Sequence, residues 1–376
     1  MFEVDVATTV EDVARLLPEW QRLDAALTPR LPFTSPAWCL TWWRHFRRSG
    51  LAARDELRVY TLRDAGGRLV GLAPMFVALR PGVGPIATRE LQFFGADPYV
   101  TELRGPVCRR EDLAAVSAAL VAHVALEDGY DWVQWRGLSP EAQFAGDPAV
   151  FLPDGKLDSI DHFLRLDASW ETFKSTLPRN IKESLRKCYN SLARDGIRFT
   201  FRVIETGPAV REAIDVFFRL HAGRAGLAGT IDHADAFASA SAKAFLSDYA
   251  EAMALGGSLR IFQLVIDETI VATRIGFLLG DELYLYFSGY DAAWSRYSVM
   301  TTTVAESLKW AIGQGLGIVN LSSGTDVSKT RWRPHSVTAV GGYTCAPAAL
   351  SRLAFNLVRR LRAGRTADPD RTEDAA

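Results

Sequence analysis

Hydroxyl, tyrosine and arginine side chains gather between residues 281 and 332, and their spacing suggests an anion-binding site. The pattern predicts a strand over 283–287, a turn over 288–291, a helix opening near 301–303 and a second strand over 318–321. Such a unit points several backbone N–H groups at the helix N-terminus, where the helix dipole favours negative charge. We therefore expect this spot to accept a phosphate or another anion, although the same unit is also common in α/β proteins that bind nothing there.

Two further groups of side chains could act on an anionic or protonated ligand. The first is one polar face of a predicted helix within residues 170–196, formed by Arg179, Lys182, Arg186 and Asn190. This face is either a solvated surface or a clamp for an anionic ligand or a lipid surface. The second is the pair His221 and Arg224, which stand one helical turn apart at the end of another predicted helix.

Composition excludes several classes of protein. A hydrophobic content of 48% with 23% charged residues is typical of a folded globular chain, and the 376 residues suffice for two domains. The formal net charge of −1 argues against nucleic-acid binding through overall charge. The four cysteines show no CxxC spacing and the six histidines no HExxH or HxH pattern, so we expect no disulfide framework and no metal site.

The ends of the chain bear on its location. The N-terminal segment carries early acids and no uninterrupted apolar core, and no run of about 18 apolar residues exists, so we expect a cytoplasmic protein. Residues 349–365 contain five arginines and no acid, with leucines at helical spacing. This predicts a basic amphipathic helix, which either lies on the inner face of the cytoplasmic membrane or docks on the protein itself.

The elements that must position these side chains occur twice. Residues 57–79 resemble 259–279 as a hairpin, residues 90–99 resemble 282–291, and the strand at 132–137 resembles that at 318–324. The order hairpin, strand, polar loop, helix, strand is therefore repeated at a distance of about 200 residues, which indicates duplication. Hairpins combined with a strand–helix–strand crossover predict mixed sheets and an α/β (α+β) fold.

The repeat sets the expected domain boundaries. We predict an N-terminal domain over 1–160, a C-terminal domain over 161–346 and the basic helix and tail over 347–376. A helix over 33–46, with Ser35 as its cap and Pro36 at its first position, belongs to the first domain. Its tryptophans are expected in the core. A long helical region is expected over 234–255.

Five segments in order, FTSPAWCLTWWRHF, LPRNIKESLRK, FFRLHAGR, YFSGYDAAWSRYS and GTDVSKTRW, resemble a known family. They are similar to the CelD/BcsL-like acyltransferases of the GNAT superfamily, which are tandem GNAT-like domains related to the Fem aminoacyltransferases. The resemblance covers roughly residues 30–335 and agrees with the internal repeat. It implies a degenerate first GNAT-like domain and a catalytic second one.

The resemblance implies transfer of an acyl group from acyl-CoA, a co-substrate, to an amine, with no permanently bound cofactor. It also implies the position of the CoA diphosphate, at the helix N-terminus near residues 298–303. The superfamily's phosphate loop has the form Arg/Gln-x-x-Gly-x-Gly/Ala, whereas this chain has RYSVMT and no glycine. Arg296, Ser298, Thr301 and Thr302 could replace the missing contacts. Backbone N–H groups around Ser288 and Gly289 could stabilise negative charge on the thioester oxygen.

The resemblance also directs the choice of proton-transfer groups. His221 is the first choice for the base that deprotonates the amine, because a histidine pKa is already near 6.5, but a histidine that caps its own helix is an equal alternative. Asp291 could orient or deprotonate, or could simply form a turn. Tyr290 and Tyr297 could each protonate the leaving thiolate.

Residues near the end of the second domain are assigned mainly by resemblance. Lys329 and Trp332 form a Lys-x-x-Trp element that resembles the Phe-Lys motif of Fem enzymes. It implies that Lys329 holds an acceptor phosphate or the tetrahedral oxyanion, with help from Arg331. The residues expected to contact the acceptor are Arg179, Lys182, Arg186, Arg224, Arg331 and Trp332.

The leading hypothesis is an N-acyltransferase that acts on the amine of an envelope precursor, either a sphingoid long-chain base, as in ceramide synthesis, or an amino sugar. The basic helices and the aromatic helix favour an amphiphilic acceptor at the inner membrane face. One alternative is a Fem-like transferase that uses aminoacyl-tRNA. The other is a non-catalytic GNAT-fold binding protein, which the glycine-less loop favours. The sequence leaves the acyl-chain length, the acceptor and the oligomeric state open.

Overall fold

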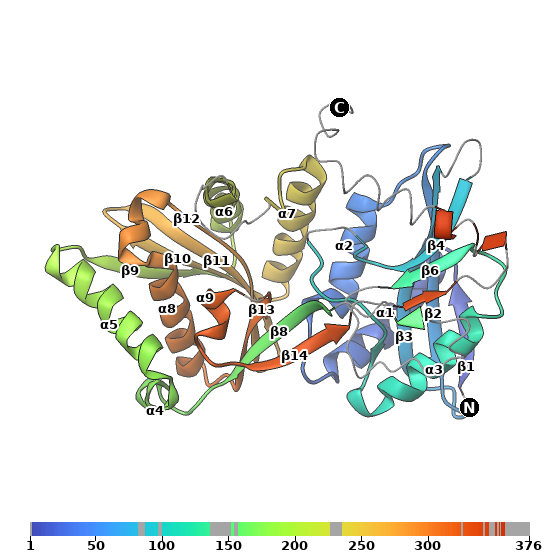
Figure 1. The fold of residues 1–376 in the computed structure, drawn as a ribbon, viewed down its shortest axis with the longest axis horizontal. Coiled ribbons are helices and arrows are strands. Elements are labelled where there is room, and N and C mark those ends of the chain that lie inside the picture. Colours follow the sequence, from blue (N-terminus) through green and yellow to red (C-terminus); the bar gives the residue numbers. More distant parts are fainter. Residues whose placement is uncertain are drawn as a thin grey trace.

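Two mixed β-sheets lie side by side with helices between them and on their outer faces (Figure 1). The computed structural model describes residues 2–81, 87–96, 100–135, 152–153, 157–225, 235–324, 326–340 and 343–345, with residues 350, 351, 353 and 355–357 near the C-terminal end. The expected α/β class with mixed sheets is confirmed.

The first half of the chain alternates strands and helices around one sheet. Its elements are β1 (Glu3–Ala7), α1 (Val10–Ala25), η1 (Pro32–Thr34), α2 (Pro36–Phe46), β2 (Arg54–Arg63), β3 (Leu69–Pro81), β4 (Ala87–Phe93), β5 (Val107–Cys108), η2 (Arg110–Asp112), α3 (Leu113–Val124), β6 (Trp132–Trp135) and β7 (Leu152–Pro153).

The second half builds the other sheet. Its elements are β8 (Leu157–Arg165), α4 (Trp170–Thr176), α5 (Arg179–Arg194), β9 (Phe199–Ile204), α6 (Ala209–Ala225), α7 (Ala240–Leu255), β10 (Leu259–Ile266), β11 (Thr269–Leu279), β12 (Glu282–Tyr290), η3 (Ala292–Tyr297), α8 (Val299–Gly313), β13 (Ile318–Ser323), α9 (Val327–Thr330), β14 (His335–Val340) and β15 (Tyr343–Cys345).

The internal repeat is confirmed and is longer than the sequence suggested. The sheets run β1-β2-β3-β4-β6-β15-β7 and β9-β10-β11-β12-β13-β8-β14, so these seven positions correspond; β5, which pairs with β3, is an addition to the first sheet. Each has one parallel pair, β4 with β6 and β12 with β13, joined by a helical crossover. The helix pair α1 and α2 precedes β2 as α6 and α7 precede β10, so the repeat begins one strand and two helices before the hairpin.

The two halves exchange strands at their junctions. Strand β8 follows the first half in the sequence but pairs with β13 and β14 of the second sheet. Strand β15 follows the second half but pairs with β6 and β7 of the first sheet. The boundary expected at residue 160 therefore lies inside β8, and β15, which lies within the range expected for the second domain, belongs to the first sheet. The segment that links the two halves thus adds β8 to the second sheet, and the segment after the second half adds β15 to the first sheet.

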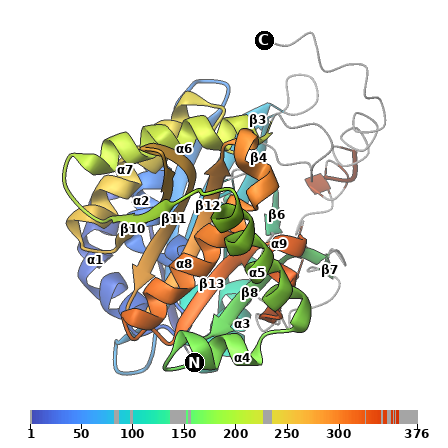
Figure 2. The ribbon, with the colours of Figure 1, turned by 90° about the vertical axis from the view of Figure 1, so that its left-hand side faces the viewer.

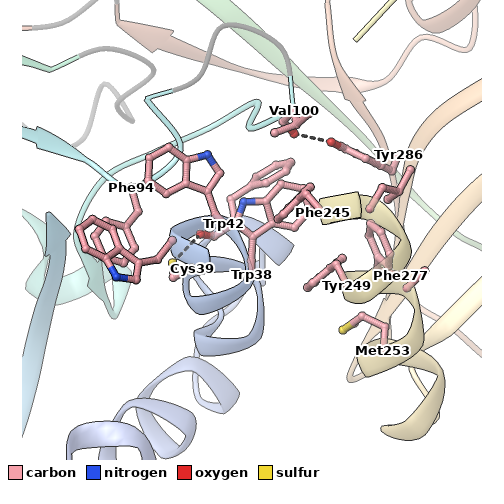
Figure 3. Close-up of a cluster of buried hydrophobic side chains, with 14 of the residues drawn as sticks. Trp38, Cys39, Trp42, Phe94, Val100, Phe245, Tyr249, Met253, Phe277 and Tyr286 are labelled. Atoms are coloured by element: carbon pink, nitrogen blue, oxygen red, sulfur yellow. Dashed lines mark hydrogen bonds between the residues drawn. The ribbon is translucent and has the colours of Figure 1, made fainter. Parts of the chain in front are cut away.

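Helices α2 and α7 pack against each other between the sheets, and a single hydrophobic core runs from one half to the other. The indole of Trp38 lies edge-on to Phe245 and Tyr249, with ring centroids 4.8 Å away in both cases (Figure 3). Trp38 also meets Tyr286 of β12 at 5.6 Å. Because a buried aromatic residue contributes about 3–5 kcal/mol to stability, this cluster holds the halves in one arrangement.

The second sheet is covered on both faces. Alternate residues of its strands face opposite helices: Tyr284 joins the core with α6 and α7, whereas Leu285 packs with α5 and α8. Figure 2 looks onto α5 and α8 on the outer face. This alternation is the period of two that a sheet buried on both faces requires.

Several local predictions are confirmed and two are corrected. The Ser35 side chain caps α2 with Pro36 at its first position, as expected. The turn expected at 288–291 is wrong, because β12 continues to Tyr290 through pairing with β11. The helix expected from residue 234 begins at Ala240, because the Ser239 side chain caps it there.

The sequence predicted neither a membrane-spanning segment nor a metal site, and both can be checked for the described residues. Within them, no helix is long and apolar enough to cross a bilayer, and no group of three or more His, Cys, Asp or Glu side chains could hold a metal ion. The arginines of the predicted basic tail helix lie outside the residues that the structure describes.

Candidate functional site

Strands β12 and β13 diverge after a short parallel pairing, and one arginine bridges the gap. The ladder joins Glu282–Tyr284 to Ile318–Asn320 and then stops. The guanidinium of Arg274, from β11, donates hydrogen bonds to the carbonyls of Leu285 (3.0 Å) and Leu321 (3.1 Å). It thereby satisfies backbone acceptors that the separated strands leave free. Burial lowers the pKa of Arg274 to about 10, so the side chain stays charged near neutral pH.

The β11–β12 ladder is irregular at the same place. Its register shifts between Arg274 and Gly276, because Arg274 faces Ser288 while Gly276 faces Leu285. Two residues of β12, Tyr286 and Phe287, therefore oppose one residue of β11. Such a bulge redirects the strand end that leads to Ser288 and Tyr290.

The loop before α8 reaches a glycine-like conformation without glycine. Ser298 has φ 53° and ψ 44°, in the left-handed region, and its carbonyl accepts a hydrogen bond from the N–H of Thr301 at 2.8 Å. The side chain of Ser298, the N-cap residue, makes no capping hydrogen bond to the first turn of α8. Backbone N–H groups at the start of this 15-residue helix therefore face outward, and the helix dipole makes the spot electropositive.

A cavity of about 310 Å³ opens at this helix N-terminus. None of the described residues that line it is acidic, and three are arginines: Arg224, Arg274 and Arg331. The other lining residues are Ser288, Tyr290, Ser295, Ser298, Val299, Met300, Thr301, Val304 and Ser328. We call this space the anion pocket, since its charge and hydrogen-bond donors match a phosphate or carboxylate.

The arginines of the anion pocket are held in place but keep donor capacity. Arg224 donates to the Ser288 hydroxyl at 3.0 Å, and Arg331 donates to the Thr301 hydroxyl. The Nε atoms of Arg274 and Arg331 are buried and have no hydrogen-bond partner within the described part of the chain. Burial lowers the pKa of Arg224 and of Arg331. A bound anion would offset the burial of these charges.

Six of the residues predicted from sequence line the anion pocket: Tyr290, Ser288, Ser298, Thr301, Arg224 and Arg331. They come from β12, the loop before α8, α8 itself, the end of α6 and the residue after α9. The bulge and the αL residue bring these elements together. The remaining predicted residues lie elsewhere.

His221 lies behind the strand and does not line the anion pocket. It is buried among the rings of Phe217, Phe237 and Phe287. Its Nδ1 lies 2.9 Å from the Ser288 carbonyl, which can only accept, so Nδ1 carries the proton and Nε2 is the free base. Nε2 is 3.7 Å from a carboxylate oxygen of Asp235, and burial lowers the pKa of His221.

Gly289 faces α6, which explains why the position requires glycine. A Cβ there would lie 2.5 Å from the backbone nitrogen of His221 and 2.6 Å from the carbonyl carbon of Leu220. The side of Gly289 that a side chain would occupy is thus filled by helix backbone. The residue lets α6 approach β12 closely enough for Arg224 to reach Ser288.

The other predicted residues of this loop and of the first turn of α8 do not line the anion pocket. The Tyr297 hydroxyl donates to Asp195 at the end of α5, and Arg296 stacks on the Tyr297 ring, 4.6 Å from its centroid. Asp291 accepts from the N–H of Ala293 and caps η3. Thr302 is fully buried, since the helical period turns it away from Thr301.

The predicted basic face of α5 borders a second cavity, of about 390 Å³, which lies beside the other end of α8. Lys182 and Arg186 line it, with the rings of Trp170 and Tyr189. Arg179 instead points outward and pairs with Glu183. Since Lys309 of α8 also lines this cavity, ten residues beyond Val299, it is about 15 Å along the helix from the anion pocket.

The Lys-x-x-Trp element is split between two environments. The Lys329 ammonium donates to the Ser323 carbonyl and to the Ser322 hydroxyl at 3.3 Å, and burial lowers its pKa. Trp332 is 1% exposed and belongs to the core between α5, α8 and the sheet. Neither residue lines the anion pocket.

Sequence reasoning missed Arg274, although a signal was present. It is the single charged residue in TIVATRIGFLL, an otherwise uncharged strand, and a buried charge in such a run marks a specific contact. It also missed Ser295 and Ser328, whose loop positions carry no signal of that kind.

Residues 179–330 match the family model described as an acetyltransferase (GNAT) domain. None of the curated protein sequences compared with this chain matches it significantly. A structure named FemX is similar with a TM-score of 0.60, 9% identity and coverage of 93% of this chain and 99% of that one. The C-terminal domain (DUF2156) of an Agrobacterium fabrum protein named as a lysylphosphatidylglycerol synthetase gives a TM-score of 0.50 and 15% identity, with coverage of 93% and 96%.

A tandem GNAT protein from the clavulanic acid biosynthesis pathway is also similar, with a TM-score of 0.44, 13% identity and coverage of 92% of this chain and 99% of that one. At these identities the solved structures show the fold alone. Residues 179–330 are thus similar to a GNAT acetyltransferase domain, and the chain as a whole shares the fold of the FemX structure.

Proposed function

We propose that the protein is an N-acyltransferase that binds the diphosphate of acyl-CoA in the anion pocket. The observation that carries this proposal is the arrangement of Arg224, Arg274 and Arg331 around the uncapped N-terminus of α8, with no acid among the described lining residues. Phosphate oxygens would accept from the backbone N–H groups and from guanidinium N–H groups of the arginines. Ser298 supplies the loop conformation that glycine provides in relatives.

The chemistry follows from the same geometry. A neutral amine attacks the thioester carbonyl, the C–N bond forms, the C–S bond breaks and the thiolate leaves. Tyr290, which lines the anion pocket, is the proposed proton donor to that thiolate, and the resulting tyrosinate accepts the proton that the amine nitrogen loses. His221 acts in this scheme as a positioning residue, because its Nδ1–H fixes the carbonyl of Ser288.

The proposed acceptor is the amine of an envelope precursor, a sphingoid long-chain base or an amino sugar, as in the CelD/BcsL-like enzymes that the sequence resembles. Such a substrate would be met at the inner face of the cytoplasmic membrane.

The test incubates the purified protein with a panel of acyl-CoAs and with sphinganine or glucosamine, and follows free CoA thiol and the acylated product by mass spectrometry. Product formation that is lost in Arg331→Gln supports the proposal. If no amine releases CoA, the proposal fails. Aminoacyl transfer from charged tRNA would assign the Fem-like alternative, and CoA binding without turnover would assign a binding protein.

A further inference from the structure

The first domain extends a carboxylate into the second domain. Glu102 lies in the segment between β4 and β5 and accepts three hydrogen bonds, all from the second domain. The donors are the Tyr284 hydroxyl (2.5 Å), the Ser322 hydroxyl (2.9 Å) and the Ser323 N–H (2.9 Å).

Neighbouring residues fix this segment against the same strands. The Tyr286 hydroxyl donates to the carbonyl of Val100 (Figure 3), and the Trp38 indole N–H donates to the Thr101 hydroxyl at 3.2 Å. The position of Glu102 is therefore set by the core between the domains. Its hydrogen-bond donors come from both β12 and β13, the strands that diverge beyond Tyr284 and Asn320.

Ser322 connects Glu102 to Lys329. Its hydroxyl donates to Glu102 and accepts from the Lys329 ammonium at 3.3 Å. Ser322 is buried and has φ 73°, a left-handed conformation unusual for serine, and its N–H donates to the Asn320 side chain at 2.7 Å. Backbone strain of about 1–3 kcal/mol persists only where the surroundings enforce it, and it concentrates at functional sites.

Charged groups from every neighbouring element face Lys329. Burial and Arg274 of β11 lower the pKa of Lys329, whereas Glu102, Asp326 at the start of α9 and Asp161 of β8 raise it. Asp326 is 3.8 Å from the ammonium, and burial, with a smaller effect of the Lys329 charge, lowers the pKa of His162 on β8. Among these groups, Glu102 is the one that comes from the first domain.

We infer that Glu102 is a positioning residue that holds Ser322 and keeps Lys329 protonated, so that the two domains complete one site. Lys329 stands in the sequence between Ser328 and Arg331, which both line the anion pocket, and its ammonium is directed to Ser322 and Ser323. Any role of this contact in catalysis rests on the proposed function. It assigns the first domain a direct part in the site.

The chain suits a direct test, because it contains seven lysines and all lie at or beyond position 156. The test is competitive labelling with trace acetic anhydride across a pH series, with each lysine peptide followed by mass spectrometry. Only the neutral amine reacts, so the rate reports the pKa of each lysine. Loss of the Glu102 charge in Glu102→Gln should lower the pKa of Lys329 and move its labelling curve to lower pH.

Two controls separate this result from general loosening. Glu127→Gln removes the same kind of contact, a tyrosine-bound carboxylate at Tyr60, inside the first domain, and should leave the Lys329 curve in place. Lys309 serves as the internal reference in every sample. Glu102→Asp should return the curve part of the way toward the wild type.

An unchanged Lys329 curve in a folded Glu102→Gln protein would overturn the inference. If Glu102→Gln does not fold, Ser322→Ala removes the linking hydroxyl alone, and it too should raise Lys329 labelling relative to Lys309. No shift in Ser322→Ala would equally contradict the inference. The labelling needs no substrate, so it stays informative if CoA binding fails, and CoA binding by Glu102→Gln tests the proposed function separately.

Discussion

The Arg331 guanidinium donates a hydrogen bond to the hydroxyl of Thr301 in the first turn of α8. This contact brings a cation from the residue after α9 to the positive end of an uncapped helix. The positive charge of Arg331 and the positive end of the α8 dipole are thus held next to each other. Solvent or a bound anion must offset their repulsion. The anion pocket is the consequence of that contact.

Replacement of Arg331 by Gln should weaken anion binding. One charge-assisted hydrogen bond is worth about 1.5–3 kcal/mol, so the affinity for pyrophosphate should fall about tenfold or more. The measurement is the rise in Tm with added pyrophosphate, which follows the ratio of ligand to Kd. Arg211→Gln is the matched control and should keep the wild-type response, because Arg211 on α6 forms an exposed ion pair with Glu251 on α7.

Ser298 should tolerate glycine but not valine. Its left-handed conformation costs an L-residue roughly 1–2 kcal/mol, which glycine avoids and a β-branched side chain increases. Ser298→Gly should therefore keep Tm and pyrophosphate binding near wild type, whereas Ser298→Val should lower both. Equal behaviour of the two variants would mean that this backbone conformation does not shape the pocket.

Gly289→Ala should destabilise the protein and disturb the pocket. The added methyl would meet the backbone of α6 at 2.5 Å, and overpacking of this kind costs about 1–3 kcal/mol or more. The expected result is a lower denaturation midpoint and weaker pyrophosphate binding, as α6 carries Arg224. Gly313→Ala, where nothing lies within 4 Å, should leave both unchanged or slightly improved.

Local sequence signals predicted much of this fold. Ser35 and Pro36 mark a helix start because capping and a fixed φ act within one turn. The repeated hairpin and crossover can be recognised in the sequence because both copies keep the same order of apolar strands. The correspondence of α1 and α2 with α6 and α7 was not visible, because packing against the sheet constrains only their apolar faces, and many sequences satisfy that.

The rest depended on contacts between distant residues. The pairing of β15 with β6 joins segments about 200 residues apart. The local sequence of Tyr343–Cys345 does not indicate which strand it pairs with. The anion pocket was predicted from one helix start, but Arg274 enters it from a neighbouring strand and Glu102 approaches from the other domain. Thr302 was predicted to contact CoA but is buried in the core, because it lies one position along α8 from Thr301 and faces another side of the helix.

Asp161 should make stability depend on pH. Burial raises its pKa from 3.8 to about 6, so the folded state holds a proton that the unfolded state releases between those values, and the contribution of Asp161 to stability falls as pH rises through that window. Asp161→Asn should therefore be more stable than wild type above about pH 6, by roughly 2–3 kcal/mol, with little difference near pH 4. Urea denaturation at both pH values measures this.

The matched control has the opposite sign. Hydrogen bonds from the Arg68 and Gly66 N–H groups lower the pKa of Asp64, so its charged form stabilises the folded state at neutral pH. Asp64→Asn should lose stability above about pH 4 instead of gaining it. A gain in Asp64→Asn would show that these hydrogen bonds do not stabilise its charged form. The absence of a gain in Asp161→Asn would show that burial does not raise the pKa of Asp161.

Titration calorimetry with CoA tests the central claim most directly, since that claim is that the anion pocket holds the CoA diphosphate. The account predicts one saturable site in the wild type, binding weakened about tenfold or more in Arg331→Gln, and wild-type affinity in Arg211→Gln. Absence of saturable binding by the wild type, or equal loss in both variants, would contradict it.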